Sequence, residues 1–332
     1  MPKNLTLQDY VEGVLSHNRQ VTARTITMIE SALPAHRQMA QAIINDLIPH
    51  AGKAIRVGIS GVPGVGKSTF IESLGMMLVE KGYQVAVLAV DPSSSRSGGS
   101  ILGDKTRMEK LSLHPNAFIR PSPSSGTLGG VAQRTRETMV VCEAAGYDVV
   151  LVETVGVGQS ETAVASMVDL FLVLMLAGAG DDLQGIKKGI LEIADIIAIN
   201  KADGDNIERA QAAKKDYENA LSLMNPETPT WSVPVLTCSA KTMDGIEDVW
   251  NGILDHRRKF TDSGELADLR RRQDVAWMRS LVEQELKDRF FNNPDVKQRW
   301  PEMVRAVENG TISPTLAAGE LLSLDCQVRP SS

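Results

Sequence analysis

The sequence predicts an α/β protein with a mostly parallel sheet flanked by helices and with helical segments added at both ends. Apolar strand-like runs alternate with helical patterns near residues 55–60, 84–91, 117–120, 148–153, 170–176, 196–200 and 235–238. This alternation is typical of parallel strands whose connecting helices cover both faces of the sheet. Ligand sites of such sheets lie beyond the carboxyl ends of the strands. The loops that follow these runs are therefore where we expect function.

The region before the first strand has helical character. Leu7, Tyr10 and Val14 recur at helical spacing, and Pro34 indicates a break between helices. Residues 1–50 are therefore expected to form an N-terminal helical extension, followed by the sheet domain over residues 51–260.

The first loop, from Gly61 to Thr69, reads G-V-P-G-V-G-K-S-T. It stands between a strand-like run and a helical pattern, which is the context that a phosphate-binding loop requires. Its glycines allow backbone N–H groups to converge on phosphate oxygens at a helix N-terminus. Lys67 supplies positive charge to the outer phosphates, and the Ser68 hydroxyl can bind magnesium. The sequence thus predicts a nucleoside triphosphate site made by Gly61, Val62, Pro63, Gly64, Val65, Gly66, Lys67, Ser68 and Thr69.

Two later loops select the base. The strand-like run at 196–200 ends in N-K-A-D, and the run at 235–238 is followed by S-A-K. The Asp203 carboxylate can accept two hydrogen bonds from guanine, whereas adenine lacks that donor pair, and such sites discriminate by about 10⁴-fold or more. The predicted nucleotide is therefore GTP, with base contacts from Asn200, Lys201, Asp203, Ser239, Ala240 and Lys241.

The magnesium and the attacking water have several candidate ligands. Glu153 ends a buried strand-like run in the place where a D-x-x-G motif would carry aspartate, and its longer side chain is compatible with contact through a water. Asp91 ends another run and could orient the attacking water. Asp104 could reach the magnesium shell, or could instead be a helix cap. The expected metal ligands are Ser68, Asp91, Asp104 and Glu153, and the expected catalytic residues are Lys67, Asp91 and Glu153.

Hydrolysis is expected to be slow without help. Ras-like proteins position the water with a glutamine directly after the D-x-x-G glycine. Val157 holds that position here, and the nearest glutamine is Gln159. This favours a regulatory GTPase whose site is completed by a partner.

The segment 177–189 is rich in glycine and charge and follows a core strand. It could be a simple loop into a helix, or a third switch that reports the nucleotide state to a partner. The residues that would make this switch are Asp181, Asp182, Gln184, Lys187 and Lys188.

Residues 261–332 form a long amphipathic extension. Val275, Met278, Val282 and Leu286 share one stripe at helical spacing, and a shorter helix is expected to begin at Pro314. The stripe could pack on the chain's own sheet domain or against a second subunit. Its place after a complete sheet favours a dimerisation arm. The run 270–272, three arginines, is expected to be an exposed helix face.

Composition excludes other classes. The net charge of −6 disfavours nucleic acid. The three cysteines are widely spaced, as expected of free thiols in a reducing cytoplasm, and no His-rich or Cys-rich tract suggests metal delivery. The most apolar stretch, 170–180, is too short to span a bilayer, and the N-terminus does not resemble a signal peptide. The expected location is the cytoplasm.

Several motifs together resemble the MeaB/ArgK family, GTPases associated with methylmalonyl-CoA mutase. They are the phosphate loop, V-D-P-S-S, G-D-K-T-R-M, V-E-T-V-G-V-G-Q-S-E, A-G-D-D-L-Q-G-I-K-K-G and N-K-A-D. The resemblance implies a homodimeric, GTP-dependent chaperone that gates cofactor loading of an adenosylcobalamin-dependent mutase and protects it, while the mutase stimulates hydrolysis. It implies Mg²⁺ with the nucleotide and no cobalamin site on this chain. It also places glutamate at position 153 as a family trait.

Two alternatives remain. One is a kinase or ATPase linked to amino-acid transport, against which N-K-A-D argues. The other is a metallochaperone GTPase, against which the lack of metal-ligand clusters argues. The sequence does not identify the mutase that would be served.

Overall fold

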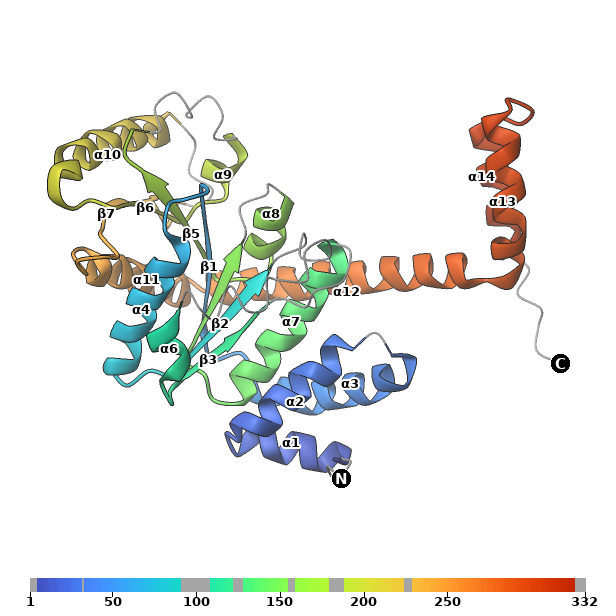
Figure 1. The fold of residues 1–332 in the computed structure, drawn as a ribbon, viewed down its shortest axis with the longest axis horizontal. Helices are drawn as coiled ribbons and strands as arrows, with labels where there is room; N and C mark the ends of the chain where they lie inside the picture. Colours follow the sequence, from blue (N-terminus) through green and yellow to red (C-terminus); the bar gives the residue numbers. More distant parts are fainter. Residues whose placement is uncertain are drawn as a thin grey trace. The chain divides into compact units, whose positions relative to one another are not determined.

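The computed structural model describes residues 5–31, 33–90, 108–121, 128–154, 159–178, 188–223 and 229–325. The chain separates into two compact units, Met1–Gln273 and Asp274–Ser332. The first unit contains the sheet and is shown with its helices in Figure 1.

Within the described residues, the sheet has seven strands in the order β3-β2-β4-β1-β5-β6-β7. Every neighbouring pair is parallel. The strands are β1 (Ile55–Gly61), β2 (Val85–Val90), β3 (Ala117–Arg120), β4 (Val149–Thr154), β5 (Leu170–Leu176), β6 (Ile196–Asn200) and β7 (Val235–Thr237). The predicted fold class is confirmed.

Helices cover both faces of the sheet, because alternate side chains of each strand enter different cores. In β4, Val149 and Leu151 belong to one core, and Val150 and Val152 belong to the other. The first core is closed by α4 (Lys67–Glu80), α6 (Glu109–Leu113) and α11 (Ile246–Asp262). The second is closed by α7 (Leu128–Ala144), α8 (Gln159–Ala165), α9 (Lys188–Glu192) and α10 (Ile207–Ser222).

The N-terminal region is helical, as predicted. Its elements are α1 (Leu7–Leu15), α2 (Arg19–Glu30), α3 (Pro34–Leu47) and the short 3₁₀ helix η1 (Ile48–His50). Thr6 and Asp9 form a reciprocal capping box at the start of α1, and α3 begins at Pro34. Helices α2 and α3 pack against α7, so this extension adds to the second core (Figure 1).

After α11, the described residues form three more helices: α12 (Glu265–Asn292), α13 (Pro294–Glu308) and α14 (Pro314–Asp325). Helix α12 begins in the first unit and continues across Gln273 into the second. Helix α14 begins at the predicted Pro314, with Ser313 Oγ accepting from the Leu316 N–H at 3.2 Å. The predicted boundary after residue 260 stays a prediction.

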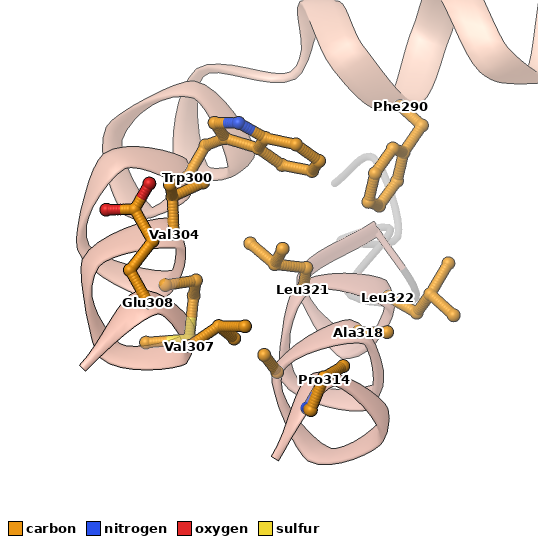
Figure 2. Close-up of a pocket in the computed structure, with 11 residues that line it drawn as sticks. Phe290, Trp300, Val304, Val307, Glu308, Pro314, Ala318, Leu321 and Leu322 are labelled. Atoms are coloured by element: carbon orange, nitrogen blue, oxygen red, sulfur yellow. The ribbon is translucent and has the colours of Figure 1, made fainter. Parts of the chain in front are cut away.

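The second unit has a small core of its own, formed where α13 packs on α14. An apolar cavity of about 410 Å³ opens between these helices. Phe290, Trp300 and Leu321 point into it, as Figure 2 shows. Among the described residues, no helix combines the length and apolar character needed to cross a bilayer.

The expectation for the arginine run is wrong at one position. Arg271 is exposed, but the Arg270 side chain is only 16% exposed and pairs with Asp169. Tertiary burial here overrides the local charge pattern.

Candidate nucleotide-binding site

The predicted loops meet at one edge of the sheet. Strands β1, β4, β6 and β7 run parallel, so their carboxyl ends lie on the same edge. These ends deliver the phosphate loop, Glu153, the N-K-A-D loop and the S-A-K loop. The candidate site is therefore assembled by sheet topology.

Two glycines shape the phosphate loop where larger residues would not fit. A Cβ on Gly61 would lie 2.3 Å from the Leu174 carbonyl oxygen of the neighbouring strand. Gly66 caps α4 with φ +91°, and a Cβ there would approach Asn200 Nδ2 to 3.3 Å. The loop thus turns into the helix in a left-handed conformation that favours glycine. As a result, the N-terminus of α4 points to the place where phosphates would bind.

The Lys67 ammonium lies across the phosphate loop. Its Nζ donates to the Gly61 carbonyl at 2.7 Å and to the Val62 carbonyl at 3.4 Å. Burial lowers the pKa of Lys67, while the negative charges of Glu153 and Glu161 oppose that shift. The lysine is therefore held among acceptors that a phosphate oxygen can replace.

The residues present fit a magnesium ion. Ser68 Oγ donates to Glu153 Oε1 at 3.2 Å, which brings a hydroxyl and a carboxylate oxygen together beside the phosphate loop. Magnesium prefers such hard oxygen ligands and takes the rest of its shell from phosphates and water. No cluster of three or more His, Cys, Asp or Glu side chains suited to a metal occurs within the described part of the chain. The Ser68 hydroxyl and the Glu153 carboxylate therefore suit an ion that takes its other ligands from a bound nucleotide and from water.

Asn200 ties the phosphate loop to the S-A-K loop. It is 1% exposed. Its Nδ2 donates to the Val65 carbonyl at 2.8 Å, and its Oδ1 accepts from the Ala240 N–H at 3.1 Å. Lys201, with φ +62°, donates from Nζ to the Gly64 carbonyl at 2.8 Å. Two consecutive residues of β6 and its loop therefore brace the phosphate loop from the side of the base.

The Asp203 carboxylate is held by a neighbouring hydroxyl. Ser239 Oγ donates to Asp203 Oδ1 at 2.9 Å, and Ser239 Oγ in turn accepts from the Thr242 N–H at 3.2 Å. The Ala202 N–H donates to the Cys238 carbonyl at 3.0 Å. These bonds join the N-K-A-D and S-A-K loops and leave acceptor positions on Asp203 for a ligand. Lys241 is exposed at the end of the second loop.

Some predicted site residues lie outside the described residues: Asp91, Asp104, Val157, Asp181, Asp182, Gln184 and Lys187. The backbone of Lys188 begins α9. The residues that the structure does bring together are the phosphate loop, Ser68, Glu153 and the two base loops.

Two further contacts were not predicted from the sequence. Thr154 Oγ1 donates to Ser60 Oγ at 2.8 Å, which joins β4 to β1 in a fully buried position next to Glu153. Glu161, in the first turn of α8, is 8% exposed and close enough for its charge to act on Lys67. An acidic residue in a first helical turn usually indicates a surface interaction with the helix dipole, so its burial had no sequence signal.

This geometry defines the class as a P-loop nucleotide-binding protein whose base loop is suited to guanine. The profile of the family described as "Methylmalonyl Co-A mutase-associated GTPase MeaB" matches residues 22–295. The chain belongs to this family and is a P-loop GTPase.

Relatives agree with the family assignment. The chain is similar to "GTPase ArgK" of Escherichia coli K12, with 48% identity over 97% of each sequence. It is also similar to "Methylmalonic aciduria type A homolog, mitochondrial" of Mus musculus, with 45% identity over 93% of this chain and 77% of that protein. The crystal structure titled "LAO/AO transport system kinase" matches with TM-score 0.77 and 40% identity, over 98% of this chain and 100% of that one.

Proposed function

We propose that this GTPase binds GTP at the sheet edge described above and acts as a nucleotide-dependent chaperone of an adenosylcobalamin-dependent methylmalonyl-CoA mutase. The observation that supports the nucleotide site is the set of hydrogen bonds by which Asn200 and Lys201 of the N-K-A-D loop hold the phosphate loop, while Asn200 also bonds the S-A-K loop. The family description and the name of the mouse relative support the mutase as partner.

In the proposed site the chain's own residues divide the work. The backbone of the loop 61–69 cradles the phosphates, and Lys67 neutralises charge on the outer ones. Asp203 accepts from guanine while Ser239 fixes its orientation. Ser68 and Glu153, with Asp91 and Asp104, would hold Mg²⁺, which neutralises charge on the β- and γ-phosphates when bound. Because position 157 is valine, hydrolysis is slow until the partner supplies a group that positions the attacking water.

Base selection can be tested by substitution. Asp203→Asn replaces a paired acceptor with an amide that suits xanthine, so GTP affinity should fall and xanthosine triphosphate affinity should rise, each by about 10²-fold or more. Calorimetry with GTP, xanthosine triphosphate and ATP measures this change. An unchanged preference for GTP would mean that Asp203 does not read the base. Tight ATP binding by the unmodified protein would instead favour the transport-kinase alternative.

The same variant tests the mutase partnership. An affinity pull-down from cell extract with a non-hydrolysable GTP analogue and with GDP should recover a cobalamin-dependent mutase in only one nucleotide state. The Asp203→Asn protein should lose this dependence on the guanine analogue and regain it with the xanthine analogue. Recovery of the mutase with no dependence on either nucleotide would contradict a nucleotide-gated chaperone.

The homodimer proposal is supported by the surface of the second unit. Val275, Met278, Val282 and Leu286 lie on one stripe of α12 and are 54–63% exposed. The cavity between α13 and α14 adds a second apolar surface. Contiguous exposed apolar surface of this kind is typical of protein interfaces. Val282→Lys should therefore weaken the dimer in sedimentation experiments. Ser280→Lys, about 200° around the helix from Met278, is the matched control.

A further inference from the structure

Helix α8 (Gln159–Ala165) connects the end of β4, which carries Glu153, to the segment 166–169 that contacts α12. At its first turn, the Glu161 carboxylate is buried and acts electrostatically on Lys67. At its last turn, the chain continues through Ser166 and Val168 to Asp169, just before β5. The helix has 7 residues and so spans about 10 Å.

The body of α8 is in close contact with the strand that carries the phosphate loop. Val164 is fully buried. A Cβ on Gly58 of β1 would lie 3.0 Å from Val164 Cγ1 and 2.7 Å from Phe171 Cδ2. Val164 of α8 and Phe171 of β5 therefore pack so closely on β1 that a side chain at position 58 would displace them. Because close-packed elements move as units rather than deforming, a displacement at one end of α8 must appear at the other end.

The far end of α8 is joined to the first part of α12, residues 265–273, which we call the root of α12. Gln273 is buried, and its Nε2 donates to the Val168 carbonyl at 2.8 Å. Arg136 of α7 donates to the Ser166 carbonyl at 2.7 Å and to the Gln273 carbonyl at 3.2 Å. The root is thus hydrogen-bonded to the segment that leaves α8.

A buried ion pair completes this junction. Arg270 donates from Nε to Asp169 Oδ1 at 2.8 Å and from Nη2 to Asp169 Oδ2 at 2.7 Å. Asp169 also accepts from the Arg56 N–H at 2.9 Å, and Arg270 donates to the Ala54 carbonyl at 2.8 Å. This two-point geometry fixes both distance and orientation, which lysine cannot reproduce. The root of α12 is therefore sensitive to the position of Asp169.

We propose that α8 and the Asp169–Arg270 pair transmit the phosphate state of the bound nucleotide to the root of α12. The γ-phosphate brings negative charge to Lys67 and repels the buried Glu161 carboxylate. The first turn of α8 then shifts, and its last turn moves Asp169 against Arg270. The inference rests on the proposed phosphate site and deepens it by naming how that site is read elsewhere in the chain.

Amide hydrogen exchange of the full-length protein tests the relay. With GDP and with a non-hydrolysable GTP analogue, exchange of the root amides 265–273 should differ by about 5-fold or more, the usual lower range of allosteric coupling. Arg270→Lys should reduce that difference to less than about 2-fold. Arg271→Lys is the matched control, because Arg271 is 72% exposed and pairs with Asp268.

Linkage supplies a second readout that a merely structural role would not change. If the root senses the nucleotide, Arg270→Lys must change the ratio of GTP-analogue affinity to GDP affinity. The change should equal the factor by which this variant reduces the hydrogen-exchange difference of the root, although Arg270 belongs to no nucleotide loop. Glu161→Gln should remove the exchange difference from the other end of α8. Glu208→Gln, an exposed first-turn glutamate of α10, is its control.

The outcomes separate this inference from the site on which it rests. If amides of the loop 61–69 distinguish the two nucleotides while the root exchanges equally with both, the relay is wrong and the phosphate site stands. If the loop amides gain no protection from either nucleotide, the site and the relay both fail. Loss of the root difference in Glu161→Gln and in Arg270→Lys, but in neither control, supports the relay.

Discussion

Asn200→Ala is the sharpest test of how the nucleotide site is held together. The Asn200 side chain is almost fully buried and bonds two separate loops, through Nδ2 to the Val65 carbonyl and through Oδ1 to the Ala240 N–H. Truncation to alanine leaves both backbone groups without this partner in a buried position. The phosphate loop and the S-A-K loop then lose their direct link.

The magnitude follows from these two bonds. A buried polar group that loses its partner costs about 1–3 kcal/mol, so the two together cost about 2–6 kcal/mol. If only about 2 kcal/mol of this appears in binding, nucleotide affinity falls about 30-fold. The remainder should appear as a lower free energy of unfolding.

Calorimetric titration with GDP and a GTP analogue, together with urea unfolding, measures both parts. Asn206→Ala is the matched control, since Asn206 lies in the same loop but makes an exposed bond from its amide to the Lys201 carbonyl at 2.8 Å. The control should bind within about threefold of the unmodified protein. A folded Asn200→Ala protein that also binds within about threefold would refute the bracing role.

Three other predictions follow from the same structure. Lys67→Ala removes the positive charge at the outer phosphates, so GTP turnover should fall by at least about 10²-fold in a phosphate-release assay, and near-normal turnover would refute the assignment. Ser239→Ala removes the hydroxyl that orients Asp203 at 2.9 Å, so GTP should bind about tenfold more weakly by calorimetry, with unchanged affinity as the contrary result. Burial lowers the pKa of His256 to about 4 against the opposing charges of Asp169, Glu265 and Asp255. Below about pH 6.5 this histidine binds a proton in the unfolded chain but not in the folded one. The free energy of unfolding should therefore decline by about 3 kcal/mol between pH 6.5 and pH 4. In His256→Phe, urea unfolding should show that much less pH dependence over this window, and an equal slope in both proteins would contradict the assignment.

Much of this molecule was predictable because its signals are local. Each strand of the sheet is a short apolar run, and each nucleotide loop directly follows one of them. Once the strands are parallel, sheet geometry brings loops that are more than a hundred residues apart to one edge. The start of α14 at Pro314 was predictable for the same reason, since a proline at the first helical position is a local preference.

The unpredicted features depend on contacts between distant segments. Arg270 and Asp169 are 101 positions apart, and nothing beside either residue indicates that the other will be buried against it. Glu161 has the local pattern of an exposed first-turn acid, yet the packing of α8 on β1 buries it. Burial and pairing of charged groups are tertiary properties, and the sequence pattern indicated only an exposed helix face at residues 270–272.

The base loop separates two tasks that a single residue could not perform well. Asn200 bonds the protein on both sides, through one amide hydrogen to the phosphate loop and through its oxygen to the S-A-K loop, so its main part is to hold these loops together. Asp203 is fixed by one hydroxyl and retains acceptor positions for the base. Variants at Asn200 should therefore weaken all nucleotides alike, whereas variants at Asp203 should change which base is preferred. Because the two effects arise from non-overlapping hydrogen bonds, affinity and base specificity in this site should be separable by mutation.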